Sequence, residues 1–199
     1  MKFYVIDAIR GGGKTTVTKL VGDMLNAEGH AVQIGRDPGS TVLGEELRLI
    51  LRNNSIKRHR YVEGYLYLAA REQLIQEILL PLKEKEAETE KHTIHLQDRW
   101  TPSTLAYQDK LFNGIAMEVH RGCPPNKIFW IDTPPDVAAE RARLRDKLET
   151  IPVEEYEWSL YERFWELNAG EVERVNGLLS GPEVAQRIFD RIVEDLQNV

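Results

Sequence analysis

The segment Asp7–Thr16 restricts the possible folds of this chain more than any other stretch, because it places three consecutive glycines between a β-prone run and a helix start. The run KFYVI at residues 2–6 is typical of a buried strand. Gly11, Gly12 and Gly13 allow the backbone N–H groups to turn inward, where they can bind phosphate oxygens, and the dipole of the next helix adds positive potential. The segment therefore predicts a strand, a phosphate-binding loop and a helix.

The loop is close to the pattern G-x-x-x-x-G-K-[ST]. Its one departure is Ala8, which stands where the pattern has its first glycine. We expect Lys14 to reach the β- and γ-phosphates of a nucleotide, Thr15 to bind Mg²⁺, and Thr16 to complete the donor site. The alternative, a hairpin turn before an unrelated helix, is disfavoured because the strand and the amphipathic helix around the loop are the context that the motif requires.

The composition limits the class of protein. The chain has 199 residues, of which 42% are hydrophobic, so we expect one compact domain over residues 1–199. Its net charge of -6 argues against broad binding of nucleic acid, since acids outnumber the bases that would neutralise a phosphate backbone. Cys123 is the only cysteine, and no histidine spacing is typical of a metal site. No apolar run approaches the roughly 20 residues of a membrane span, so we expect a soluble, cytoplasmic protein that contacts no membrane.

Strand and helix patterns alternate along the chain, which predicts an α/β fold with one doubly wound, five-stranded parallel sheet flanked by helices. The predicted strands are residues 2–6, 31–35, 93–97, 127–132 and 172–175. Helices are predicted at residues 43–51, 61–87, 103–119 and 153–167. Three further helices are predicted to begin after the loop, at Pro134-Pro135 and after Pro182. We expect Pro81 to kink the helix at residues 61–87 and Asn113-Gly114 to break the helix at residues 103–119.

Charged residues follow several predicted strands. Arg36 follows the second strand, and Asp98 and Arg99 follow the third, while Arg141, Arg143 and Arg145 cluster in a later helix. The carboxyl ends of parallel strands meet at the edge where ligands bind, so we expect these groups to converge on the loop. Phosphoryl transfer between two nucleotides needs a donor cradle, a metal, cations for the acceptor phosphate and a mobile cationic cover. The chain has a candidate for each part.

The order of short motifs resembles that of the thymidylate kinase family, within the P-loop nucleoside-monophosphate kinases, over most of the chain. The motifs are Gly13-Lys14-Thr15-Thr16, Arg36-Asp37-Pro38-Gly39-Ser40-Thr41 before Gly44-Glu45, Tyr67-Leu68-Ala69-Ala70-Arg71-Glu72-Gln73, Asp98-Arg99-Trp100, Ser103-Thr104-Leu105-Ala106-Tyr107-Gln108, Ile131-Asp132, and Arg141 through Glu149. Each motif is weak alone, but seven in the right order are hard to produce by chance. The resemblance implies a three-layer P-loop kinase sandwich that uses ATP and Mg²⁺ to convert a deoxynucleoside monophosphate, above all dTMP, into its diphosphate.

The resemblance also implies roles at the reacting phosphates. Arg36 and Arg99 would hold the 5′-phosphate of the acceptor, which suits the fork geometry of guanidinium groups. Asp98 would hold the Mg²⁺ shell or orient the attacking phosphate. Because the acceptor oxygen is already anionic, the chemistry needs positioning and charge neutralisation more than a strong base.

A second set of implied roles concerns the base and the sugar. Tyr67 would stack on the pyrimidine, and Arg71, one helical turn further on, would hydrogen-bond its exocyclic oxygen. Thr104 would meet the base edge, with Gln108 nearby. Tyr107 would lie under the sugar, where a 2′-hydroxyl would clash with it.

Two segments depart from the family pattern. At Arg10 the family usually has an acidic residue that accepts a hydrogen bond from the 3′-hydroxyl of the acceptor, and arginine has no acceptor. Either Arg10 supplies charge to the transition state, or the acceptor is not plain dTMP. The lid, at about residues 142–151, has Lys147 where arginine often stands, and we expect Arg143 or Arg145 to close over the phosphates. These departures point to a divergent member of the family, for which a viral origin is one explanation.

Several single assignments have a structural alternative that the sequence leaves open. Tyr67 could equally be an aromatic residue of the core, and Arg36 could form a salt bridge in a turn. Asp98 and Arg99 could form an ion pair with each other, and Arg141 could lie on the surface of a helix.

The function and the assembly also have alternatives. The rival functions are a kinase for another or a modified deoxynucleoside monophosphate, a deoxynucleoside kinase in which Asp7 deprotonates a 5′-hydroxyl, and an inert nucleotide-binding regulator. The resemblance implies a homodimer through sheet-flanking helices. The apolar residues Leu66, Leu74 and Ile78 are candidates for that interface, although they fit a core equally well.

Overall fold

The fold is that of a computed structural model, which describes residues 1–88, 93–108, 110–146 and 172–198. Its strands form one sheet in the order β2-β3-β1-β4-β5, and each neighbouring pair is parallel. The strands are β1 (Lys2–Asp7), β2 (Ala31–Arg36), β3 (Thr93–Asp98), β4 (Lys127–Asp132) and β5 (Val172–Asn176). Each agrees with a predicted strand to within one residue. The prediction of a five-stranded parallel sheet is confirmed.

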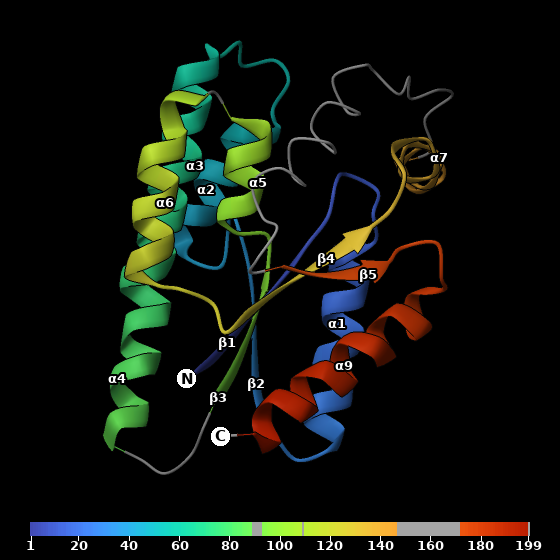
Figure 1. Cartoon of the computed structure of the whole chain (residues 1–199). Helices are drawn as coiled ribbons and strands as arrows, with labels where there is room; N and C mark the ends of the chain where they lie inside the picture. The colour runs from blue at the N-terminus through green and yellow to red at the C-terminus, as the bar shows by residue number, and fades with distance from the viewer. Residues whose placement is uncertain (89–92, 109, 147–171, 199) are drawn as a thin grey trace.

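Helices cover both faces of the sheet (Figure 1). On one face lie α1 (Lys14–Ala27) and α9 (Gly181–Gln197). On the other side lie α2 (Val42–Arg52), α3 (Arg60–Leu74), α4 (Leu80–Glu88), α5 (Thr101–Tyr107) and α6 (Asn113–Gly122). The helix α7 (Pro135–Asp146) follows β4. The arrangement is a three-layer sandwich, as the sequence predicts. None of the described helices is long and apolar enough to cross a membrane.

The sheet is buried on both faces, so alternate residues of one strand enter two different cores. Tyr4 of β1 packs with Ile188 of α9 in the first core. Its neighbour Phe3 packs with Leu74 of α3 and with Leu79 in the second core. This two-sided burial explains why the strands appear in the sequence as nearly continuous apolar runs.

The helix predicted at residues 61–87 is interrupted before Pro81. It consists of α3, a π-helical segment η1 (Ile75–Leu79) and α4. Proline has no N–H for the regular helix ladder, and its ring crowds the carbonyl four residues earlier, so an irregular turn just before it is expected.

The helix predicted over residues 103–119 is broken, and the break begins a few residues before the predicted point. The helix α5 ends at Tyr107, a 3₁₀ turn η2 (Lys110–Phe112) follows, and α6 begins at Asn113. The break lies at Gln108, whose backbone is extended with φ -95° and ψ 164°. The helix predicted at residues 153–167 lies outside the described residues.

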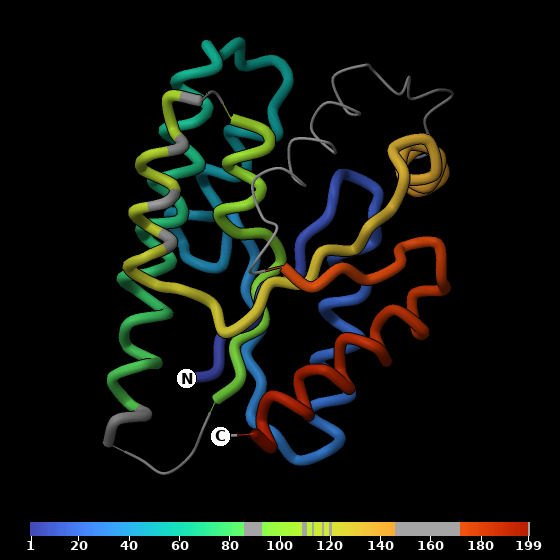
Figure 2. Tube along the Cα trace, in the orientation of Figure 1, coloured from blue at the N-terminus to red at the C-terminus, as the bar shows by residue number. Residues whose placement is uncertain are grey.

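The carboxyl ends of the central strands are level, which places the charged residues at one edge. Asp98 at the end of β3 is in register with Ile6 of β1 and with Arg36 of β2. Asp7 at the end of β1 is in register with Trp130 of β4. In Figure 2 the loop between β1 and α1 rises at this edge and lies beside the segment that leads from β4 to α7.

Candidate active site

The glycines of the phosphate-binding loop (residues 8–15) are required for two different reasons. Gly11 and Gly13 have φ of +84° and +89°, in the left-handed region that favours glycine. A Cβ atom at Gly11 would also collide with the carbonyl oxygen of Ala138 in α7. A Cβ atom at Gly12 would lie 2.7 Å from the methyl group of Ala8. Gly12 therefore makes room for the alanine that replaces the first glycine of the pattern.

Lys14 is buried at the start of α1 and lies over the loop. Its Nζ donates a hydrogen bond to the carbonyl oxygen of Ile9 at 3.3 Å. Burial lowers the pKa of Lys14 to about 7, and the charge of Arg99 acts in the same direction, whereas Asp98 and Asp7 oppose the shift. An anionic phosphate beside this ammonium group would favour its charged form.

Thr15 and Asp98 form an oxygen pair that fits Mg²⁺. The Thr15 hydroxyl donates to Asp98 Oδ2 at 2.5 Å. The other carboxylate oxygen, Oδ1, is buried and has no hydrogen-bond partner among the described residues. The same residues contain no cluster of three or more His, Cys, Asp or Glu that could cage a metal. A hard cation held by one carboxylate, one hydroxyl and the substrate phosphates is the usual form of a nucleotide-linked Mg²⁺ site.

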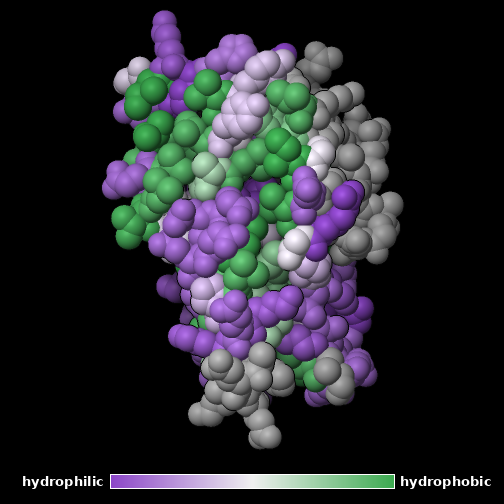
Figure 3. All heavy atoms as spheres, turned by 90° about the vertical axis from the view of Figure 1, so that its left-hand side faces the viewer, coloured by the Kyte–Doolittle hydropathy of each residue, from purple (hydrophilic) through white to green (hydrophobic). Residues whose placement is uncertain are grey.

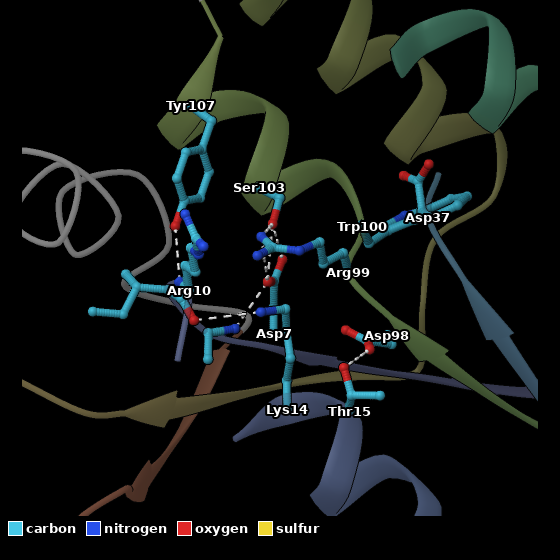
Figure 4. Close-up of polar contacts among 12 residues, drawn as sticks. Asp7, Arg10, Lys14, Thr15, Asp37, Asp98, Arg99, Trp100, Ser103 and Tyr107 are labelled. Carbon is cyan, nitrogen blue, oxygen red and sulfur yellow. Dashed lines mark hydrogen bonds and ion pairs between the residues drawn. The ribbon is translucent and has the colours of Figure 1, made fainter. Parts of the chain in front are cut away.

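Arg99 begins the turn from β3 into α5 and has φ +74°, one of two non-glycine residues with positive φ in the described ranges. Its backbone N–H donates to the carbonyl oxygen of Ile6 at 3.2 Å. Its guanidinium donates from Nη1 to Ser103 Oγ at 2.8 Å and lies 5.4 Å from the centre of the Tyr107 ring. Figure 4 shows this side chain directed toward Asp7 and the loop. The internal Asp98–Arg99 ion pair is not formed: Asp98 binds Thr15, and Arg99 faces Asp7.

Arg71 is buried, and its hydrogen bonds link α3 to the turn after β2 and to the region of α5. Its Nε donates to Asp37 Oδ2 at 2.6 Å, its Nη1 to Thr104 Oγ1 at 2.7 Å, and its Nη2 to the carbonyl oxygen of Trp100 at 3.2 Å. Its guanidinium also lies 5.3 Å from the Trp100 ring. Nη2 also lies 2.5 Å from Asp37 Oδ2, so the buried guanidinium is paired with a buried carboxylate.

Tyr67 lies one helical turn before Arg71 and is half-buried. Burial raises the pKa of its phenol, and Glu63, Arg99, Asp37 and Arg48 also act on it. The phenol therefore lies within electrostatic range of Arg99 and Asp37.

Arg36 forms a salt bridge with Glu45, as in the structural alternative to phosphate binding. Its Nη2 lies 2.6 Å from Glu45 Oε2 and its Nε 3.1 Å from Glu45 Oε1, at the exposed start of α2. The hydrogen bonds pull down the pKa of the Glu45 carboxyl. Arg36 is at the predicted edge, but its guanidinium would have to leave Glu45 to reach a phosphate.

Arg10 and Tyr107 meet at the opposite end of the loop. The backbone N–H of Arg10 donates to the Tyr107 hydroxyl at 3.3 Å. In Figure 4 the Arg10 side chain lies next to the Tyr107 ring. Burial raises the pKa of Tyr107, and the charge of Arg99 opposes this shift. Thr104 and Gln108, at the two ends of the last turn of α5, are buried.

The arginines of α7 have separate partners. Arg141 donates from Nη1 to the carbonyl oxygen of Gly177 at 2.8 Å, so it holds the turn after β5. Arg143 pairs with Glu140 at 2.6 Å on the same helix. The charge of Arg145 contributes to the lowered pKa of Lys14, so Arg145 lies within electrostatic range of the loop. The rest of the lid predicted at about residues 142–151, from Lys147 onward, lies outside the described residues.

Sequence reasoning missed three members of this region: Ser103, Asp37 and Arg48. Ser103 links Arg99 to Asp7, and Asp37 anchors Arg71. Arg48 donates to the carbonyl oxygen of Pro38 at 3.1 Å. Ser103 and Asp37 lie within motifs at the predicted edge, which was the one available signal for them, whereas Arg48 lies outside those motifs. The partners Asp7 of Ser103 and Arg71 of Asp37 are distant in the sequence.

Comparisons with known proteins agree with this geometry. The family model described as "Thymidylate kinase" matches residues 6–187. A thymidylate kinase of Synechococcus sp. (strain JA-3-3Ab) is 33% identical in an alignment 199 positions long that covers 94% of this chain and 93% of the relative. A thymidylate kinase of Deinococcus radiodurans is 34% identical in an alignment 157 positions long that covers 74% of this chain and 73% of the relative. Since the match spans the loop, the acceptor motifs and most of the sheet, this chain belongs to the thymidylate kinase family.

Proposed function

We propose that this chain transfers the γ-phosphoryl group of ATP to dTMP and releases dTDP and ADP, as thymidylate kinases do. The observation that carries the proposal is the meeting of two half-sites at one sheet edge. The loop with Lys14 forms the donor half, and Arg99 with the Arg71 network forms the acceptor half. Thr15 and Asp98 lie between them.

On the donor side, the N–H groups of Gly11, Gly12 and Gly13 and the side chain of Lys14 would bind the phosphates of ATP, with Thr16 completing the loop. Thr15 and Asp98 would hold Mg²⁺. When bound, the ion neutralises charge on the donor phosphates as the bond to the leaving oxygen breaks.

On the acceptor side, Arg99 would bind the 5′-phosphate, and Arg36 would join it after release from Glu45. Tyr67 would stack on the base, Arg71 would hydrogen-bond its exocyclic oxygen, and Thr104 and Gln108 would line the base edge. Tyr107 would lie under the deoxyribose. The phosphate oxygen that attacks is already anionic, so these residues work by alignment and charge neutralisation.

We assign the cover over the phosphates to the lid at about residues 142–151 of a single domain spanning residues 1–199. Arg143 and Arg145 are its cationic candidates. Arg10 would add charge from within the loop. If Arg10 acts in the transition state, Arg10→Ala will lower kcat and leave the KM for dTMP unchanged, whereas an unchanged kcat contradicts that role.

The substrate assignment is tested by ADP release with each of the common deoxy- and ribonucleoside monophosphates in the presence of MgATP. The proposal predicts that dTMP has the highest kcat/KM. Turnover of dCMP or dGMP at the same kcat/KM would contradict the base-binding roles of Tyr67, Arg71 and Thr104.

The rival deoxynucleoside kinase would need a base for a neutral 5′-hydroxyl. Asp7 was the candidate, but it is fully buried and already accepts hydrogen bonds from Ala8 and Ser103. The paired oxygens of Thr15 and Asp98 and the buried Lys14 count against an inert regulator, since each serves a phosphoryl-transfer site.

A homodimer through the sheet-flanking helices is part of the proposal. Of the three residues predicted for its interface, Leu74 is in the core, Ile78 packs against the core, and Leu66 is half-buried. Exposed apolar side chains instead include Val62 and Tyr65 on α3 and Leu111 and Ile115 near the start of α6. In Figure 3 hydrophobic side chains gather on the upper part of the face that carries these helices.

The assembly is tested by light scattering after size exclusion. The expected mass is twice 22.9 kDa, and Val62→Glu is expected to halve it. A monomeric wild-type chain would contradict the dimer. We also place the activity in the cytoplasm, because a kinase of free nucleotides depends on the ATP there.

A further inference from the structure

Asp7 is the buried charged group to which the proposed mechanism gives no task. Its side chain is fully buried at the end of β1, directly before the phosphate-binding loop. Arg99 Nη1 lies 3.9 Å from its Oδ1, and the charges of both Arg99 and Lys14 act on its carboxyl. A buried carboxylate costs free energy unless its oxygens are satisfied, so its partners indicate what it does.

In the hydrogen bonds that the described residues make with the Asp7 side chain, the carboxylate is the acceptor. The backbone N–H of Ala8 donates to Oδ1 at 2.8 Å. The Ser103 hydroxyl lies 2.9 Å from each of Oδ1 and Oδ2. An acceptor-only environment is that of an ionised carboxylate. Burial raises the pKa of Asp7, while Arg99, Lys14 and these donors oppose that shift.

The Ser103 hydroxyl passes this constraint to Arg99. Nη1 of Arg99 donates to Ser103 Oγ at 2.8 Å, and the same Nη1 lies 3.9 Å from Asp7 Oδ1. A hydroxyl has one hydrogen to donate and lone pairs to accept. Because Asp7 takes the hydrogen, the lone pairs of Ser103 are turned toward Arg99. Figure 4 shows the side chains of Asp7, Ser103 and Arg99 directed toward one another between the loop and α5.

We propose that Asp7 is a positioning residue that orients the Ser103 hydroxyl and, through it, holds the Arg99 guanidinium in place for the acceptor phosphate. The inference rests on the proposed function, in which Arg99 binds that phosphate. Asn at position 7 is nearly isosteric, but its amide group would donate to Ser103 Oγ and compete with Arg99. The arrangement also explains how a long, flexible arginine is fixed beside the loop, since the Tyr107 ring bounds its other side.

A double-mutant cycle tests the coupling. The four proteins are the wild type, Asp7→Asn, Arg99→Lys and the double variant, and the readout is kcat/KM for dTMP at saturating MgATP. Asp7→Asn is expected to lower this value by about tenfold in the wild-type background and by less than about twofold beside Lys at position 99. A residue that only stabilises the fold would lower it by the same factor in both backgrounds, which would overturn the proposal.

Asp195→Asn is the matched control. Asp195 is also a carboxylate that accepts a short hydrogen bond, from Tyr4 at 2.5 Å, but it lies on α9, away from Arg99. Its effect should be the same with Arg or Lys at position 99.

Ser103 provides a second route if Asp7→Asn does not fold. Ser103→Ala is expected to weaken dTMP binding in calorimetry about tenfold, and Ser103→Thr, which keeps the hydroxyl, should restore most of it. Equal affinities for Ala and Thr at this position would refute the link. A wild-type chain that does not phosphorylate dTMP would refute the proposed function instead, so the two failures are distinct.

Discussion

Arg99 combines the side chain that binds the acceptor in our proposal with a backbone conformation that suits glycine. Its φ of +74° costs an L-residue roughly 1–2 kcal/mol. The family resemblance implies that Arg99 binds the acceptor phosphate, and its place after β3 favours a position in the site. Its backbone conformation could not be predicted, because two hydrogen bonds impose it. Ile6, which accepts from the backbone N–H, is distant in the sequence, and the bond to Ser103 forms only once the turn has formed.

Two variants at this position separate the backbone from the side chain. Both Arg99→Gly and Arg99→Ala lose the guanidinium, so both are expected to lose dTMP phosphorylation. Because glycine adopts positive φ freely, Arg99→Gly should be about 1 kcal/mol more stable than Arg99→Ala in urea unfolding. Equal stabilities would mean that the turn relaxes once the arginine is removed.

A second prediction at residue scale concerns Ala8 and Gly12, which lie so close together in the loop that only one of the two positions can carry a methyl group. Gly12→Ala should weaken ATP binding and lower Tm, because its Cβ would lie 2.7 Å from the Ala8 methyl. Adding Ala8→Gly removes that neighbour and should restore most of both losses. The check is calorimetric ATP affinity and Tm of the two single variants and the double variant. Additive losses in the double variant would contradict the steric account.

At the scale of elements, the strands were predictable because burial on both faces leaves apolar runs, whereas the polar pairs inside the sheet were not. His95 on β3 is fully buried and its Nε2 lies 2.9 Å from Gln97 Oε1. The two residues are neighbours on one face of the strand, beside Gly35 of β2, where a Cβ would strike both side chains. The sequence shows the strand but not this packing, since β2 and β3 are far apart in the chain.

His95 gives the fold a defined pH dependence. Burial lowers the pKa of His95 below its ordinary value, and the bond to Gln97 only partly opposes this. Below about pH 6.5 the unfolded chain therefore binds a proton that the folded chain does not, so stability present above that pH is lost as the pH falls, at most about 1.4 kcal/mol per unit. His95→Gln should flatten this decline between pH 7.5 and 5.5 in urea unfolding. The same slope in both proteins would contradict the assignment.

At the scale of the whole molecule, the site depends on the order of the strands in the sheet, which the periodicity of apolar residues does not predict. β3 lies between β1 and β2, so Asp98 and Arg99 lie beside the loop and not on an outer strand of the sheet. The sequence predicted that Arg36, Asp98 and Arg99 would share one edge, and they do. Their pairing could not be predicted: Arg36 binds Glu45, and Asp98 binds Thr15.

The central claim is that the two half-sites act on one phosphoryl group. It is tested most directly by supplying ATP labelled in its γ-phosphate together with dTMP and Mg²⁺ and separating the products by chromatography. The account predicts that the label enters dTDP, with one ADP formed per dTDP, and that Arg99→Lys lowers the yield. ADP formed with the label in free phosphate and no labelled dTDP would contradict it.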